Sequence, residues 1–155
     1  MGANTFDVAV WGEMIEHAAY PERILAEIRR VLKPQGWLIL STPNGERFRT
    51  GLPTFSQVKD RAPLEQHQFK PDGDGHLFLF ERSELATILA AAGFSVRAHQ
   101  YYASPWTSGR LGFRYWMSWM PAGMRARMEG WTLAAGPIVR KLTEGQVVLA
   151  VNDPK

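Results

Sequence analysis

Two short stretches of the sequence hold side chains that can bind a cation or move a proton. The first reads Glu-Met-Ile-Glu-His, so Glu13, Glu16 and His17 stand at positions i, i+3 and i+4. These side chains share one face if the stretch is helical. The second stretch, His-Leu-Phe-Leu-Phe, begins with His76. Two carboxylates and two imidazoles that converge would suit a divalent ion such as Mg²⁺, Mn²⁺ or Zn²⁺, with coordination positions left for adjacent substrate oxygens.

A simpler interpretation of these residues needs no ion. Glu13 and Glu16 can be the acids that a helix favours near its N-terminus, and His17 can hydrogen-bond the backbone. His67 is expected in a solvated loop. For His99, inside an expected strand, packing is the better interpretation. The sequence leaves the metal site and the helix-end interpretation open.

The elements that must position the first stretch alternate between strand and helix. The apolar run Phe6 to Trp11 predicts a strand covered on both faces. A helix is predicted to begin at Pro21 and to end before the turn at 33–36, because apolar residues recur in it at helical spacing. Residues 37–42 predict a second buried strand, with Trp37 in the core. Strand, helix and strand then form a right-handed crossover.

The rest of the chain predicts one more helix and two more strands. Residues 43–79 are rich in proline, glycine and charge, and are expected to form a long, lid-like loop. A helix is predicted over 81–92, with acids at its start. Strands are expected at 95–102 and at 146–151, separated by a helical insertion over 106–142.

The insertion over 106–142 concentrates positive charge and aromatic rings. It holds six basic residues, one acid and four of the six tryptophans, a net charge of +5 where the whole chain has +3. Pro121 and Pro137 are expected to interrupt its helices. The favoured role is a cover for the sheet and substrate pocket. Peripheral contact with a membrane is the alternative, and nucleic-acid binding is not favoured.

The composition is that of one ordinary globular domain. The chain has 155 residues, 45% of them hydrophobic and 21% charged, and it has no cysteine. Disulfides and thiolate metal sites are therefore excluded. No basic stretch followed by an apolar one opens the sequence, and no run reaches the roughly 18 apolar residues of a membrane span. We expect a single domain over 1–155, located in the cytoplasm.

Four groups of residues resemble the second half of the class I S-adenosylmethionine-dependent methyltransferase fold, with most similarity to the ubiquinone-biosynthesis O-methyltransferases. They are Phe6-Asp7-Val8 with Glu13-x-x-Glu16-His17, Arg30-Val31-Leu32-Lys33-Pro34-x-Gly36, Leu40-Ser41-Thr42-Pro43-Asn44, and Glu84-Leu85 with Ala91-Ala92-Gly93-Phe94. The resemblance implies an α/β fold with a truncated, Rossmann-like sheet of about four strands. The last strand would be antiparallel between its neighbours, with a helical insertion before it.

The resemblance also implies methyl transfer from S-adenosylmethionine to a hydroxyl group of a small or lipid-like substrate. Trp11 and Gly12 would lie near the cofactor. No glycine-rich loop follows a strand, so we expect the chain to lack the N-terminal half that holds most of the cofactor. His17 and His76 would be catalytic, as a base or beside a cation, as in certain metal-dependent relatives that include small-RNA 2′-O-methyltransferases.

Two alternatives to an enzyme stay open. The chain can be a non-catalytic remnant that binds a partner or assembles with one, or a membrane-surface or RNA-binding module that uses the basic insertion. A truncated sheet would expose the strand Phe6 to Trp11 as an apolar edge, and such an edge invites pairing with a second copy. We therefore also expect a homo-oligomer through this strand.

Overall fold

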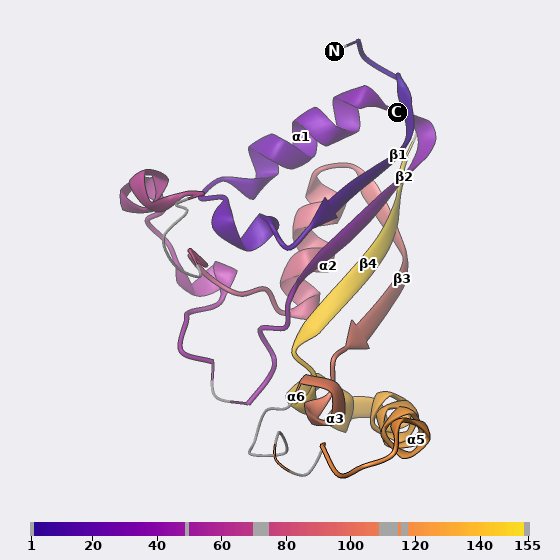
Figure 1. Cartoon of the computed structure of the whole chain (residues 1–155). Coiled ribbons are helices and arrows are strands. Elements are labelled where there is room, and N and C mark those ends of the chain that lie inside the picture. Colours follow the sequence, from indigo (N-terminus) through magenta and orange to yellow (C-terminus); the bar gives the residue numbers. More distant parts are fainter. Residues whose placement is uncertain (1, 49, 70–74, 109–114, 116–117, 154–155) are drawn as a thin grey trace.

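A mixed, four-stranded sheet with strand order β1-β2-β4-β3 forms the centre of the computed structural model (Figure 1). The structure describes residues 2–48, 50–69, 75–108, 115 and 118–153. The strands are β1 (Phe6–Gly12), β2 (Leu32–Pro43), β3 (Phe94–Tyr102) and β4 (Gly145–Asn152). β1 and β2 are parallel, and β4 is antiparallel to both of its neighbours, β2 and β3. The expected α/β sheet with an antiparallel last strand is confirmed.

Two helices, α1 (Pro21–Val31) and α2 (Arg82–Ala91), lie on the same side of the sheet (Figure 1). Proline occupies the first turn of α1, and a capping box between Glu81 and Glu84 begins α2, as the sequence signals predict. The core lies between these helices and the sheet. Its fully buried side chains include Ile15, Leu25, Leu32, Leu38, Leu40, Phe78, Phe80, Leu85 and Leu89.

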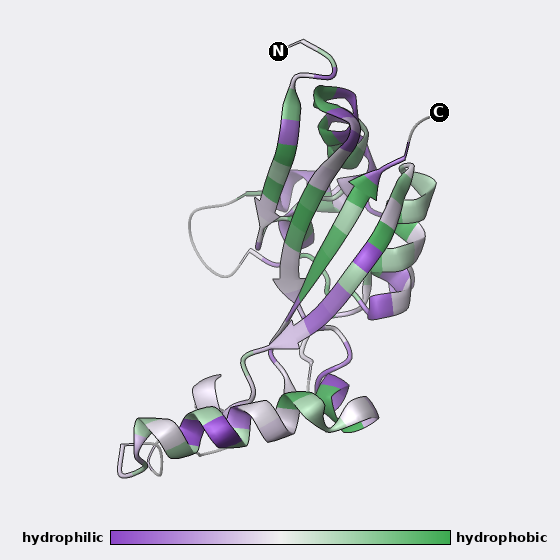
Figure 2. Ribbon diagram, turned by 90° about the vertical axis from the view of Figure 1, so that its right-hand side faces the viewer, coloured by the Kyte–Doolittle hydropathy of each residue, from purple (hydrophilic) through white to green (hydrophobic). Residues whose placement is uncertain are grey.

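The opposite face of the sheet is largely apolar and open. Figure 2 looks onto this face, and no described helix lies in front of the strands. Val10 is 73% exposed and Trp37 is 39% exposed. The predictions that Trp37 is a core residue and that the first strand is covered on both faces are therefore wrong. Side chains alternate along a strand, so the helices bury Leu38 and Leu40 but leave their neighbours uncovered.

The insertion between β3 and β4 is helical, as expected. Its described elements are α3 (Pro105–Ser108), α5 (Ala122–Ala134), the 3-10 helix η4 (Gly136–Ile138) and α6 (Val139–Leu142). α5 begins directly after Pro121, and Pro137 lies in η4, which separates α5 from α6. α5 has no buried residue and extends away from the sheet (Figure 2), so it does not cover the sheet as the sequence suggested.

The segment expected to be a lid, 43–79, is tied to the core at several points. It contains the 3-10 helices η2 (Phe55–Gln57) and η3 (Ala62–His67). Isolated parallel bridges join Asn44 to Phe80 and Thr54 to Leu79. Residues 49 and 70–74 lie outside the described part of the chain. The contacts on either side of them fix where the segment returns to the sheet.

Among the residues that the structure describes, no helix is long and apolar enough to cross a membrane. The cytoplasmic location stays a prediction.

Candidate functional site

Glu16, His17 and His76 come together at the carboxyl end of β1. The first two belong to η1 (Ile15–His17), a 3-10 helix that follows β1 closely, and the third precedes the buried Phe78. Nε2 of His17 lies 3.8 Å from Oε1 of Glu16, and Nε2 of His76 lies 3.7 Å from the same oxygen. The centroids of the two imidazole rings are 4.8 Å apart. The structure thus gathers three of the four residues predicted for a metal site.

Glu16 places an ionisable carboxyl group in the interior of the protein. Its side chain is completely buried. Oε2 accepts a hydrogen bond of 2.9 Å from Oγ1 of Thr42, whereas Oε1 has no hydrogen-bond partner among the described residues. Loss of water on burial raises the pKa of Glu16 to about 7. A buried carboxylate oxygen without a donor costs free energy, and a cation beside it would offset that cost.

The three side chains are a suitable donor set for a divalent ion. Two protein ligands that each lie about 2.0 to 2.2 Å from one ion are at most about 4.4 Å apart. The nitrogen-to-oxygen distances of 3.7 and 3.8 Å fit within that limit. Two imidazoles suit Mn²⁺ or Zn²⁺ better than Mg²⁺, which prefers oxygen ligands. Three protein ligands also leave positions for substrate oxygens.

Glu13 lies outside this cluster, contrary to the four-residue site expected from the sequence. Its backbone is left-handed, with φ +48°, and η1 begins only at Ile15. The side chains of residues 13, 16 and 17 therefore do not share a helix face. Oε1 of Glu13 instead accepts a hydrogen bond of 2.6 Å from the hydroxyl of Tyr102. Glu13 is a residue at the edge of the site, at the end of β1.

Tyr102 is a residue at this end of the sheet that the sequence did not single out. Its ring lies against Gly145, where an added Cβ would come within 2.3 to 2.6 Å of the ring and hydroxyl. Burial, together with the hydrogen bond to Glu13, raises the pKa of Tyr102 above its ordinary value, so the hydroxyl stays protonated and donates. The contact links the ends of the two edge strands, β1 and β3. A tyrosine at a strand end gives no sequence signal for such a contact.

Trp11 and Gly12, the two residues expected near the cofactor, have different surroundings. The side chain of Trp11 belongs to the core, whereas Gly12 is exposed at the end of β1. A Cβ at Gly12 would meet only Oγ of Ser41, at 3.5 Å. Within the described ranges no strand is followed by a glycine-rich loop that opens a helix. The role of these two residues toward a cofactor stays a prediction, and only Gly12 is exposed.

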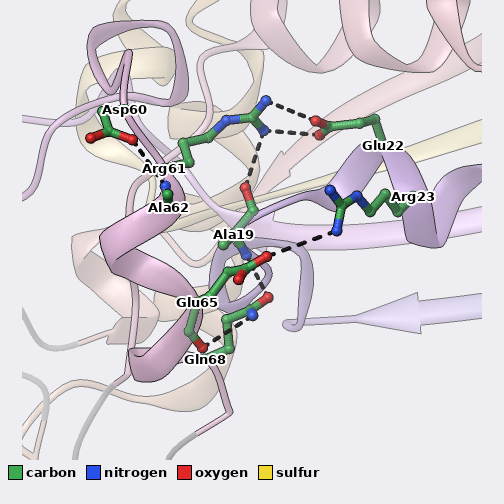
Figure 3. A network of polar contacts seen from close by, with 8 residues as sticks. All are labelled: Ala19, Glu22, Arg23, Asp60, Arg61, Ala62, Glu65 and Gln68. Atoms are coloured by element: carbon green, nitrogen blue, oxygen red, sulfur yellow. Dashed lines mark hydrogen bonds and ion pairs between the residues drawn. The ribbon is translucent and has the colours of Figure 1, made fainter.

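The segment that carries the second histidine is fixed at the start of α1. Arg61 donates hydrogen bonds of 2.7 and 2.9 Å to the two carboxylate oxygens of Glu22, and one of 3.1 Å to the carbonyl of Ala19 (Figure 3). Further along the segment, the backbone N–H of Leu77 donates to the carbonyl of Glu16 over 2.9 Å. Bidentate arginine pairs are geometrically specific, so they hold a segment in one place.

The other two histidines lie outside the cluster. His67 is exposed, and its Nδ1 is 3.2 Å from the carbonyl of Pro63. Nε2 of His99 is 2.9 Å from Oε1 of Gln146. Burial lowers the pKa of His99, so its ring is neutral near pH 7. These positions match the solvated loop and the packed strand expected for them.

Comparisons with known proteins find methyltransferases. Residues 2–99 match a family model described as a methyltransferase domain. The chain is 30% identical over 95 residues to the ubiquinone biosynthesis O-methyltransferase of Maricaulis maris, a match that spans 60% of this chain and 35% of that protein. It is also 30% identical over 110 residues to a sterol 24-C-methyltransferase of Gibberella zeae, across 65% of this chain and 25% of that protein.

The fold is also found among solved structures. A SAM-dependent methyltransferase from Archaeoglobus fulgidus aligns with a TM-score of 0.55 and 11% identity, across 97% of this chain and 61% of that one. At this identity the likeness concerns the fold alone. The chain spans less than two thirds of the length of each of these proteins.

Proposed function

Because the chain belongs to the methyltransferase domain family, within the class I S-adenosylmethionine-dependent superfamily, we propose that it forms the acceptor-activating part of an O-methyltransferase. We further propose that Glu16, His17 and His76 hold a divalent ion, and that this ion is Mn²⁺ or Zn²⁺ rather than Mg²⁺. The observation that carries the proposal is the buried carboxylate of Glu16, whose Oε1 has no donor among the described residues and lies near two imidazoles.

Methyl transfer to oxygen requires an electron-rich nucleophile held in line with the methyl group. A divalent ion, when bound, supplies Lewis acidity that lowers the pKa of a nearby hydroxyl. The substrate oxygen then bonds to the methyl carbon as the carbon–sulfur bond breaks, and the electron pair of that bond stays on sulfur. The hydroxyl proton leaves to solvent. His17 and His76 are partly exposed, so substrate can reach them.

The acceptor class follows from the site and from the relatives' names. A cation with adjacent open positions favours two neighbouring oxygens, as in a catechol. One relative is named for ubiquinone biosynthesis and the other for a sterol, both of them lipids. We therefore favour a lipid-like acceptor with adjacent oxygens. Activation of a hydroxyl group is useful for methylation of oxygen and gives no advantage for methylation of an isolated alkene carbon.

A methyl-transfer assay tests this function. The chain is incubated with methyl-labelled S-adenosylmethionine and a catechol that carries an alkyl chain, with Mn²⁺ or with EDTA. The described residues offer the cofactor only one edge, so we expect weak cofactor binding and supply it at millimolar concentration. Labelled methyl ether should form with Mn²⁺ and fall by at least about tenfold with EDTA or after His76→Ala.

Methyl transfer that is unchanged by EDTA would contradict the proposal that an ion activates the acceptor. The acceptor hydroxyl would then be deprotonated by a histidine acting as a base. In that case His17→Ala and His76→Ala separate the two possible bases. No labelled product with any catechol, from chain that calorimetry shows to bind both Mn²⁺ and S-adenosylmethionine, would contradict the proposed acceptor class.

A second function, assembly with another copy, is favoured by a separate observation. β1 is an edge strand, and the open face beside it exposes Val8, Val10, Trp37 and Ile39. An apolar edge with unpaired backbone groups favours addition of another strand. Two copies that pair through β1 would form one continuous sheet and satisfy the unpaired backbone groups of this edge.

Val10→Lys is expected to convert a self-associating chain to a monomer, because lysine at an exposed edge opposes strand pairing. Light scattering across a concentration series should show the dissociation constant rise by at least about tenfold, a change of 1.4 kcal/mol. Ala86→Lys, on the exposed surface of α2, adds the same charge and should have no effect. A wild-type chain that stays monomeric at millimolar concentration would contradict the proposed assembly through β1.

A further inference from the structure

Several large apolar side chains of the helical insertion are exposed. Trp119 is 90% exposed, Trp131 is 72% exposed and Ile138 is 61% exposed. Exposed tryptophan is unusual in a soluble domain, since its large ring is highly buried on average. An indole combines an apolar body with a polar N–H, which suits the boundary between water and lipid.

The orientation of α5 shows which of its side chains are available. Two groups on one side of the helix contact the segment around α3: Glu129 accepts from the backbone N–H of Ser104, and Oγ1 of Thr132 accepts from Nε1 of Trp106. The other side carries an outer face, which we define as Met124, Arg127 and Trp131. These residues stand at i, i+3 and i+7 and are all exposed.

The charge on this part of the molecule is mostly positive. Glu129 is the only acid between residues 106 and 142, and its carboxylate also accepts hydrogen bonds from the hydroxyls of Ser104 and Thr107. The acid is thus turned toward α3, away from the outer face. Arg127, Arg140 and Lys141 are exposed. Arg140 is ion-paired with Glu46, whose Oε1 lies 3.8 Å from its Nη1. The outer face and its surroundings therefore combine an exposed indole with an excess of positive charge.

We propose that the outer face of α5 binds the surface of an anionic lipid bilayer. Arginine and lysine side chains meet the headgroups, and Trp131 and Met124 enter the interface between headgroups and acyl chains. α5 has 13 residues, too few to span a bilayer, so contact is peripheral. α5 lies beyond the carboxyl ends of β2 and β3 (Figure 1), the end of the sheet that also holds the histidine cluster. Binding by this face is independent of methyl transfer.

Sedimentation with vesicles tests the proposal. The chain is mixed with vesicles of phosphatidylcholine alone or with about one third phosphatidylglycerol, at low salt and at about 0.5 M salt. We expect binding only to the anionic vesicles, and release at high salt. Arg127→Glu should weaken binding by at least about fivefold, and Trp131→Ala by about tenfold. Both side chains are exposed, so circular dichroism should show that the variants fold.

Matched control variants distinguish binding by the outer face of α5 from binding by the rest of the protein surface. Lys59→Glu makes the same change of charge at an exposed loop position, and Trp37→Ala removes a tryptophan from the open face of the sheet. Both should change binding by less than about twofold. Three results would overturn the proposal: equal binding to neutral vesicles, equal losses in the controls, or no binding to vesicles. RNA binding without vesicle binding would assign the basic surface to a nucleic acid instead.

Discussion

Glu16→Gln is expected to stabilise the metal-free chain and to abolish its binding of Mn²⁺. The buried Oε1 of Glu16 has no donor in the described structure, so the charged form is poorly compensated. A neutral amide keeps the volume, and its N–H groups can donate to the imidazoles. We expect the free energy of unfolding to rise by about 1 to 3 kcal/mol in urea titrations with EDTA at pH 8. Mn²⁺ affinity should fall by at least about 100-fold.

Glu13→Gln is the matched control, since it makes the same chemical change three residues away at the edge of the site. The amide oxygen can still accept from Tyr102, so stability and Mn²⁺ affinity should both change little. Equal losses of Mn²⁺ affinity in the two variants would restore Glu13 to the ligand set. A Glu16→Gln chain that is less stable than the wild type would mean that the carboxylate is compensated without an ion.

Asn44→Ala is expected to lower the free energy of unfolding by about 3 kcal/mol. Asn44 is completely buried at the end of β2. Its Nδ2 donates to the carbonyls of Arg140 and Thr143 over 2.7 and 3.1 Å, and its Oδ1 accepts from the backbone N–H of Glu46 over 2.9 Å. Alanine leaves three backbone groups without these partners. The side chain joins the helical insertion to the sheet, so the insertion should also exchange its amide hydrogens faster.

Urea unfolding measures the loss, with Thr87→Ala as the comparison. Thr87 is exposed and donates one hydrogen bond of 2.8 Å to the carbonyl of Ser83, so its loss should be less than about 0.5 kcal/mol. A loss of less than about 1 kcal/mol in Asn44→Ala would show that water takes the place of the Asn44 side chain. The junction between the helical insertion and the sheet would then be less tightly packed than the structure indicates.

The order of elements was predictable because local patterns determine it. The proline at the start of α1 and the paired glutamates at the start of α2 are helix signals that act within a few residues. Burial of individual strand residues was not predictable in the same way. Trp37 and Leu38 are both apolar residues of one strand, and only the placement of the helices decides that Leu38 is buried and Trp37 is exposed.

The candidate site was predictable in part for a similar reason. Glu16 and His17 are adjacent in sequence, and the resemblance to metal-dependent relatives added His76. Glu13 was misplaced because the prediction assumed a regular helix, whereas a left-handed residue and a short 3-10 helix follow β1. The contact of Tyr102 with Glu13 joins residues 89 positions apart, and local sequence patterns carry no information about such a pair.

Paramagnetic broadening by Mn²⁺ tests the cation site most directly. The chain has four histidines, so their imidazole signals can be assigned by single substitutions and followed by NMR as the ion is added. Substoichiometric Mn²⁺ should broaden the signals of His17 and His76, spare those of His67 and His99, and lose its effect in Glu16→Gln. Equal broadening of all four histidines, or broadening that persists in Glu16→Gln, would contradict a cation site built from Glu16, His17 and His76.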